Sequence, residues 1–164
     1  MNPKSNSTSS TTTGLEIVTI RLLDAPRKTV FAAFENPEHL ARWWGPNGFT
    51  NTIKEFDFRP GGAWRLVMLG PDGTEYDNTA EFLEVIKPEK IVYDHLGPMH
   101  RFQMTMLFEG ASNHKTKLTW RMVFERSPEN EKLRQFISDA NEQNFDRLAA
   151  YLEKMNGNGK TTVH

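Results

Sequence analysis

The stretch that decides the fold is SPENEKLRQFISDANEQNFDRLAAYLEKM, which runs from Ser127 to Met155. Its apolar residues recur every three or four positions, and this spacing predicts one long amphipathic helix near the end of the chain. Ser127 suits the N-cap and Pro128 the first helical position, while two glutamates add negative charge to the first turn. Just past this stretch, Gly157 is predicted to close the helix in the left-handed conformation.

One face of the predicted helix carries a stripe of apolar side chains, made of Leu133, Ile137, Ala140, Leu148, Tyr151 and Met155. Asn144 lies near the centre of this stripe, where its amide would be buried. A buried amide needs hydrogen-bond partners. Either the core supplies them, or the helix passes a hollow that holds water or a ligand, and the sequence leaves both alternatives open.

The composition indicates one domain without cysteine chemistry. A chain of 164 residues can bury one sizeable core. It has 20 Lys and Arg against 21 Asp and Glu and no basic run, so we expect no nucleic-acid partner. No stretch of about 20 apolar residues is present, so we expect no membrane insertion. The lack of Cys excludes disulfides and fits a cytoplasmic protein.

The chain divides into three parts by composition. Residues 1–14 are rich in Ser, Thr and Asn and lack the apolar segment of a signal peptide, so we predict a disordered tail. Residues 15–156 are predicted to form a single domain. Residues 157–164, which begin within an Asn-Gly-Asn-Gly run, are predicted to be a flexible tail.

The segments before the long helix read mainly as strands, because β-branched or alternating apolar residues fill them: Leu15–Leu23, Thr52–Phe58, Ala63–Leu69, Glu75–Ile86, Ile91–His95, Phe102–Phe108 and Lys115–Glu125. Two short helices are predicted after the first strand, one from Arg27 and one from Glu38 to Trp43. Asp24 is expected to cap the first of them.

These elements predict an α+β architecture. Strands joined by short turns pair with their neighbours, so the sheet should be an antiparallel meander with one dry face. Only the terminal helix is long enough to cover that face. The prediction is a helix-grip fold, in which a curved antiparallel sheet of six to seven strands wraps around the long C-terminal helix.

The dry face is rich in aromatic side chains and methionine, which line adaptable small-molecule pockets as well as cores. We therefore predict an apolar cavity between the sheet and the C-terminal helix. Trp43 and Trp44 end the second short helix, where one indole could anchor the helix and the other border the entrance. The candidate ligand-binding residues are Trp44, Trp64, Met68, Tyr76, His95, Met104, Trp120 and Asn144.

Several motifs resemble the Hsp90 ATPase activator homologue family: Asp24-Ala25-Pro26, Trp43-Trp44-Gly45-Pro46, Asp57-Phe58-Arg59-Pro60-Gly61-Gly62, Pro71-Asp72-Gly73, and Glu84-Val85 followed by Pro88-Glu89. This family is part of the START-like, Bet v 1-like superfamily, so the resemblance implies the helix-grip fold. Its members include a domain of Hsp90 co-chaperones and resistance proteins that bind reactive natural products. The chain leaves no room for the N-terminal domain of those co-chaperones, so we do not expect strong Hsp90 activation.

Three functional hypotheses follow. The first is a protein that binds an apolar or aromatic small molecule in the cavity, without a cofactor. The second is a cyclase- or hydrolase-like enzyme that uses His95 or Tyr76, although no catalytic residue is assigned. The third is a co-chaperone-type interaction domain with Hsp90 as its partner and an exposed apolar patch. Asp94, His95 and His100 gather around one turn, but their spacing matches no zinc pattern, so we predict no metal site.

Overall fold

The computed structural model describes residues 14–97 and 100–163, which form seven strands and three α-helices within these ranges. In chain order the elements are β1 Gly14–Leu23, α2 Arg27–Glu35, α3 Pro37–Trp43, β2 Thr50–Phe56, β3 Ala63–Leu69, β4 Glu75–Ile86, β5 Lys90–Gly97, β6 Phe102–Ala111, a single 3₁₀ turn η1 Ser112–His114, β7 Lys115–Glu125, and α4 Pro128–Val163. The predicted disordered tail lies outside the described residues, apart from Gly14.

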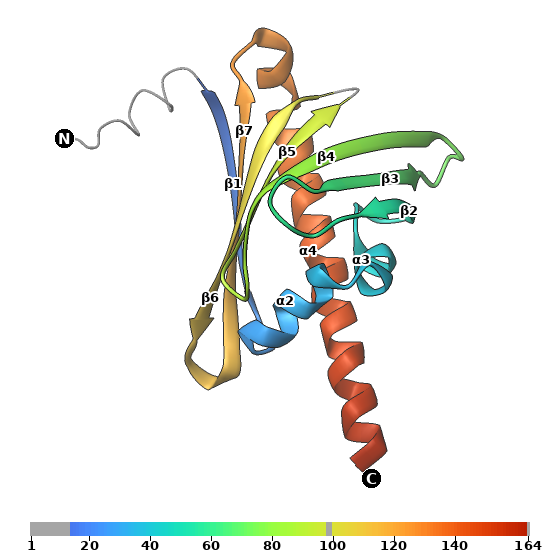
Figure 1. Cartoon of the computed structure of the whole chain (residues 1–164), viewed down its shortest axis with the longest axis vertical. Helices are drawn as coiled ribbons and strands as arrows, with labels where there is room; N and C mark the ends of the chain where they lie inside the picture. The colour runs from blue at the N-terminus through green and yellow to red at the C-terminus, as the bar shows by residue number, and fades with distance from the viewer. Residues whose placement is uncertain (1–13, 98–99, 164) are drawn as a thin grey trace, which may run out of the picture.

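The seven strands form one antiparallel sheet in the order β1-β7-β6-β5-β4-β3-β2. Strands β2 to β7 follow each other as a meander, and β1 pairs with β7 at the far edge, with Leu15 opposite Phe124. Figure 1 shows the curved sheet with α4 passing along its concave side and with α2 and α3 beside that helix. The predicted helix-grip architecture is confirmed.

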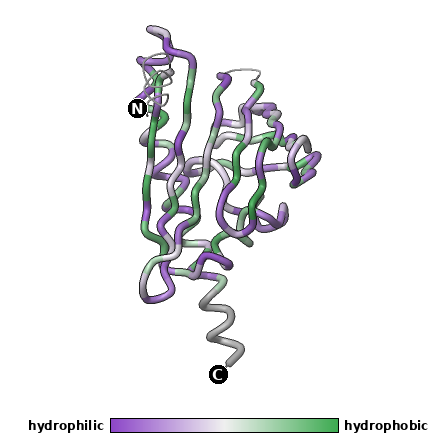
Figure 2. Tube along the Cα trace, turned by 60° about the vertical axis from the view of Figure 1, so that its left-hand side comes forward, coloured by the Kyte–Doolittle hydropathy of each residue, from purple (hydrophilic) through white to green (hydrophobic). Residues whose placement is uncertain are grey.

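Alternation along the strands decides which side chains enter the core, and Figure 2 shows green and purple segments following one another along the strands. The inward positions of β6 and β7 carry Met104, Met106, Phe108, Leu118, Trp120, Met122 and Phe124, all of them buried. From α4 the core receives Phe145, Leu148 and Leu152, and from α2 it receives Phe31 and Phe34. A single core therefore lies between the sheet and the three helices.

The beginning of α4 follows the prediction and its end does not. The Ser127 hydroxyl oxygen accepts a hydrogen bond from the Asn130 backbone N–H at 3.0 Å, as an N-cap does. The helix, however, does not stop at Gly157, because it continues to Val163. A glycine costs a helix only about 1 kcal/mol relative to Ala, and no proline in this segment blocks the continuing hydrogen bonds.

The prediction that Asp24 caps α2 is wrong. Pro26 occupies the N-cap position without a side-chain cap, and the Asp24 carboxylate lies 3.5 Å from the Lys115 ammonium. Asp24 lies two positions before that N-cap, so its side chain is out of register for capping. In α3, by contrast, Asn36 is a true cap, since its side-chain oxygen accepts from the Glu38 N–H at 2.9 Å.

Strand β2 ends at Phe56, two residues earlier than predicted. The chain turns at Asp57, whose backbone oxygen accepts a hydrogen bond from Arg59, and it returns through Gly62. A Cβ atom on Gly62 would lie only 1.9 Å from that same oxygen, so no other residue fits there. Phe58 still packs against the core, because its ring stacks on Phe56 at 5.3 Å.

In the described parts of the chain, no helix is both long and apolar enough to cross a membrane.

Candidate ligand-binding site

The two tryptophans at the end of α3 have different roles in the packing. Trp43 is buried, and its indole Nε1 donates to the Ala33 carbonyl oxygen at 3.1 Å. That carbonyl would otherwise bond the N–H four residues later, but residue 37 is a proline and has none. Trp43 thus fixes α3 to α2, whereas the Trp44 ring is only half-buried and extends to the sheet.

Trp44 brings the concave face and α3 together in a cluster of three indoles. Its ring lies 5.1 Å from the ring of Trp64 on β3 and 5.4 Å from the ring of Trp120 on β7. Trp120 in turn contacts Phe145 of α4 edge to face at 4.6 Å. We call Trp44, Trp64 and Trp120 the indole cluster. It joins four elements that are distant in sequence.

Two N–H groups of the indole cluster have no hydrogen-bond partner in the described part of the protein. They are the Nε1 atoms of Trp64 and Trp120, whose side chains are 4% and 1% exposed. A buried donor without a partner costs about 1–3 kcal/mol, and such groups are rare in folded proteins. Each of these indoles could therefore donate to an acceptor that arrives from outside the chain.

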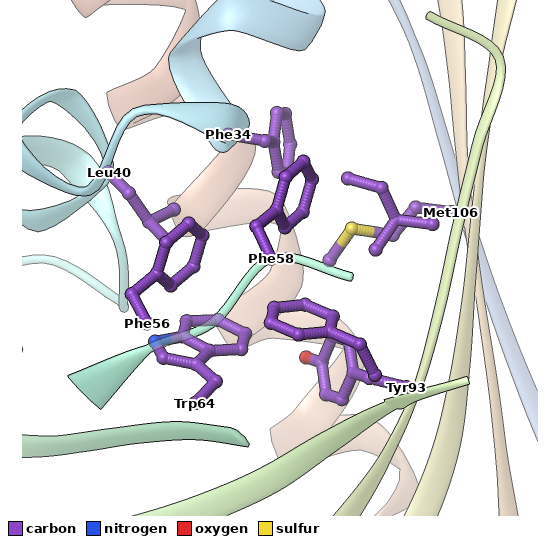
Figure 3. A pocket seen from close by; sticks show the side chains of 9 residues that line it. Phe34, Leu40, Phe56, Phe58, Trp64, Tyr93 and Met106 are labelled. Atoms are coloured by element: carbon purple, nitrogen blue, oxygen red, sulfur yellow. The ribbon is translucent and has the colours of Figure 1, made fainter. Parts of the chain in front are cut away.

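The void beside Trp64 is small. Its volume is about 10 Å³, roughly the room that one water molecule requires. Figure 3 shows Trp64, Tyr93, Phe56 and Phe58 with their rings turned toward this space. The complete lining is Phe34, Leu40, Phe56, Phe58, Trp64, Phe82, Ile91, Tyr93 and Met106. In this arrangement aromatic rings fill the space in which the sequence predicts a ligand-sized cavity.

The aromatic rings fill the space beside Trp64 through edge-to-face contacts, which large flat side chains make without leaving gaps. Tyr93 meets Trp64 at 5.3 Å and an interplanar angle of 83°, and Phe82 meets Phe58 at 5.1 Å and 87°. Burial among these rings raises the pKa of the Tyr93 hydroxyl, so that group stays protonated and available as a donor.

The two buried amides of α4 have protein partners. Asn144 donates from Nδ2 to the Trp43 carbonyl oxygen at 3.2 Å, next to the indole cluster. Asn141 donates to the Thr19 hydroxyl at 3.1 Å and contacts the Met122 sulfur at 3.3 Å. Of the two alternatives for Asn144, the structure therefore supplies a hydrogen bond within the core, and this bond ties α4 to the end of α3.

His95 lies in a polar corner of the concave face. Its Nε2 is 2.7 Å from the Asn78 side-chain oxygen and its Nδ1 is 2.7 Å from the His100 carbonyl oxygen, while its ring stacks on Phe102 at 4.7 Å. Burial lowers the pKa of His95, although the hydrogen bond to His100 opposes this shift. Asp94 points to the other face of β5 and accepts from Gln103. Among the residues the structure describes, no three potential metal ligands come together.

The remaining predicted residues are Met68, Tyr76 and Met104, which lie on β3, β4 and β6. Met68 and Tyr76 are cross-strand partners at the hairpin end of β3 and β4, and Phe49 lies 5.9 Å from the Tyr76 ring. Met104 is buried in the middle of the sheet opposite Tyr93 and Met122. Within the described residues Trp44 contacts both Trp64 and Trp120, and a role of the eight residues in ligand binding stays a prediction.

The sequence analysis missed an open hollow on the outer side of α3 and α4. Its volume is about 480 Å³, and it is lined by Ala41, Arg42, Phe49, Thr50, Arg147, Tyr151 and Lys154. The sequence does contain an indication of this hollow, because the spacing of Arg147, Tyr151 and Lys154, four and three residues apart, places them on one face of the helix. The sequence analysis considered the apolar stripe of this helix and the hollow that Asn144 could border, but not the cationic side chains beside the stripe.

Comparison with known proteins agrees with this architecture. A protein from Arthrobacter aurescens has a TM-score of 0.78 at 24% identity over 85% of this chain and 87% of its own. One from Chromobacterium violaceum has a TM-score of 0.70 at 27% identity over 84% of this chain and 96% of its own. One from Silicibacter pomeroyi has a TM-score of 0.71 at 17% identity, with coverage of 86% and 99%. No curated protein matches the chain significantly.

The family comparison is more specific than these likenesses of fold. The model of the Activator of Hsp90 ATPase homolog 1-like proteins matches residues 24–153, which include both short helices, six of the seven strands and most of α4. The motif Trp43-Trp44-Gly45-Pro46 and the indole cluster lie within the matched range. The chain therefore belongs to the family of Activator of Hsp90 ATPase homolog 1-like proteins.

Proposed function

We propose that the chain binds a small apolar or aromatic molecule that carries a hydrogen-bond acceptor, and that the indole cluster is the binding site. The observation that carries this proposal is the pair of buried Nε1–H groups of Trp64 and Trp120, which have no acceptor among the described residues. A carbonyl or ether oxygen on an otherwise apolar ligand would satisfy one of these donors and leave the rest of the ligand against aromatic rings.

Trp44 provides the means of admitting such a ligand, since the void of about 10 Å³ is too small to hold one. The backbone of Trp44 is held firmly, because its carbonyl oxygen accepts from the Asn51 amide at 2.8 Å and from Arg147 at 3.1 Å. Its ring is only half-buried. A change of side-chain rotamer at Trp44 would therefore open space beside Trp64 and Trp120 without moving α3.

The experiment compares two ligands of similar shape, naphthalene and 2-acetylnaphthalene, of which only the second has a carbonyl acceptor. The four tryptophans give four indole N–H signals in a ¹H–¹⁵N correlation spectrum. Saturating 2-acetylnaphthalene should shift the signal of Trp64 or Trp120 downfield, while the signal of Trp43 should change least because its N–H is already bonded. If neither ligand gives a saturable shift, or if both give the same shift, the proposal fails.

A matched pair of variants localises the site. Trp44→Ala should tighten binding by removing the ring that occupies the space, as cavities made by truncation accept small aromatic molecules. Phe136→Ala is the control, because Phe136 of α4 is 70% exposed and has no part in the cluster. Unchanged affinity in Trp44→Ala would assign the ligand to a different place.

A second candidate function is association with Hsp90, the partner after which the family is named. It is favoured by an exposed apolar row on the edge strand β1, where Val18, Ile20 and Leu22 are 47%, 51% and 56% exposed. Purified Hsp90 should retain the chain, and Ile20→Thr should weaken retention while Val67→Thr, on the inner strand β3, should not. No retention of the unaltered chain would exclude this candidate.

The hypothesis of catalysis by His95 gains no support, because both of its ring nitrogens face protein oxygens.

A further inference from the structure

The hollow on the outer side of α3 and α4 is distinct from the indole cluster, since the two share no lining residue. It is bounded by Ala41 and Arg42 of α3, by Phe49 and Thr50 where β2 begins, and by three side chains of α4. Figure 1 shows α3 lying between the start of β2 and α4. Its volume of about 480 Å³ is within the range of sites that hold small organic ligands.

The lining of this hollow is cationic. Arg42, Arg147 and Lys154 contribute three positive charges, and the lining contains no Asp or Glu. None of the three forms an ion pair with a carboxylate in the described part of the chain, although Arg21, by comparison, is paired with both Glu142 and Asp146. Three cations around one concavity focus a positive field that attracts anions.

Arg147 is a fixed part of that field. Its guanidinium donates to the carbonyl oxygens of Trp44, Gly45 and Pro46 at 3.1, 3.0 and 2.9 Å, so its position is set by the backbone. These oxygens are neutral and leave the charge of Arg147 uncompensated. Partial burial of that charge lowers the pKa of Arg147, and a bound anion would offset this cost.

The hollow also has an apolar wall. Tyr151 presents its ring there, and its hydroxyl is 2.5 Å from His39 Nδ1, which holds the ring in place. Phe49, half-buried, and the methyl group of Ala41 add to the same wall. A ligand that fits both parts carries a charged group and a flat or aliphatic portion.

We propose that this hollow binds an organic anion, in which a carboxylate or phosphate group lies among Arg42, Arg147 and Lys154 and an apolar ring or chain lies against Phe49 and Tyr151. This proposal does not rest on the function proposed above. The indole cluster calls for a neutral acceptor in a dry setting, whereas the hollow calls for negative charge at the surface.

The test measures the dissociation constants of 1-naphthoate and 1-naphthyl phosphate by titration calorimetry, with inorganic phosphate and neutral 2-acetylnaphthalene for comparison. The double variant Arg42→Gln/Lys154→Gln leaves the hydrogen bonds of Arg147 intact. We expect it to weaken binding of both aryl anions about fivefold, equivalent to about 1 kcal/mol, since two exposed charge contacts are removed. Added salt should weaken binding in the same direction.

The matched control is Lys28→Gln/Lys132→Gln, which removes two exposed charges from α2 and from the first half of α4. This control should leave affinity unchanged. Thr50→Glu places a carboxylate at the exposed rim of the hollow, and it should weaken anion binding as strongly as the double variant.

Equal affinity in Arg42→Gln/Lys154→Gln and in the unaltered chain would overturn the proposal, and so would an equal loss in the control pair. Inorganic phosphate bound as tightly as naphthyl phosphate would refute the apolar contribution. The indole signals of Trp64 and Trp120 report separately on the other site, so a failure of either proposal can be recognised without the other.

Discussion

Two buried tryptophans allow the unpaired indole donors to be tested directly. Trp43 and Trp120 are each 1% exposed and contact neighbouring rings in similar ways, with Phe34 touching both. They differ in one respect, because the N–H of Trp43 is bonded to Ala33 whereas the N–H of Trp120 has no partner among the residues that the structure describes. The substitutions Trp43→Phe and Trp120→Phe remove the same atoms and should nevertheless differ in their effect on stability.

The difference can be worked out from these contacts. Both substitutions lose a similar amount of apolar packing, roughly 1–2 kcal/mol. Trp43→Phe also leaves the buried Ala33 carbonyl without a donor, since residue 37 is a proline, and this adds about 1–3 kcal/mol. Trp120→Phe instead removes an unsatisfied donor and recovers a penalty of similar size. Trp43→Phe should therefore be less stable than Trp120→Phe by about 2–6 kcal/mol, the sum of the two hydrogen-bond terms.

Urea unfolding followed by circular dichroism measures both free energies of unfolding, and equal m-values would show that the denatured states are comparable. Equal losses in the two variants would refute the reasoning, because they would mean that the Trp120 N–H has a partner in solution. Affinity for 2-acetylnaphthalene provides a second measurement. It should fall in Trp120→Phe and persist in Trp43→Phe wherever the latter remains folded.

Three further predictions concern the scaffold. Gly62→Ala should prevent stable folding at ordinary temperature, because the new Cβ would lie 1.9 Å from the Asp57 oxygen, whereas Gly110→Ala, with no atom within 4 Å, should leave the melting temperature nearly unchanged. Asn141→Ala should cost about 1–2 kcal/mol in urea unfolding, since the buried Thr19 hydroxyl loses its donor, while Gln135→Ala on the exposed side of α4 should cost less than about 0.5 kcal/mol. Because burial lowers the pKa of His95 below its ordinary value of 6.5, the unfolded chain binds the proton more readily, so stability should fall as the pH drops below about 6.5. His95→Gln should flatten that part of the pH profile, and an unaltered slope would contradict the assignment.

The fold could be predicted from the sequence because apolar residues recur with the spacing of a strand or of a helix along the main elements. Alternation from Ala63 to Leu69 and from Lys115 to Glu125 placed both strands with the bounds that the structure has. One error arose where a contact between distant residues decides the role of a side chain. Asp24 has the right chemistry for a cap, but it pairs with Lys115 instead, and no local pattern reveals that contact.

The candidate site was harder to predict than the fold. Residue type and strand face placed Trp64 and Trp120 on the dry side of the sheet, but whether an indole N–H has an acceptor depends on which side chains meet in three dimensions. Cavity volume depends in the same way on rotamers. A dry face rich in aromatic side chains and methionine predicts a cavity, but rings that meet edge to face leave only about 10 Å³.

The motif Trp43-Trp44-Gly45-Pro46 is a backbone segment that neighbouring elements hold in place by hydrogen bonds to its carbonyl oxygens. Its carbonyl oxygens accept from Asn144 and Arg147 of α4 and from Asn51 of β2. Gly45 has a φ of 98°, and a Cβ there would meet the Met68 methyl carbon at 2.8 Å, so the turn requires glycine.

Because hydrogen bonds to its carbonyl oxygens fix this segment, its two tryptophan side chains are available for other contacts. Trp43 uses its N–H to fix α2, and this makes it a structural residue. Trp44 contributes a half-buried ring that rests on Trp64 and Trp120, and its backbone would stay in place if that ring moved. Arg147 meets the same carbonyls from the cationic hollow on the other side. The two proposed sites therefore share one short backbone segment, whose carbonyl oxygens are held by Arg147 and Asn51.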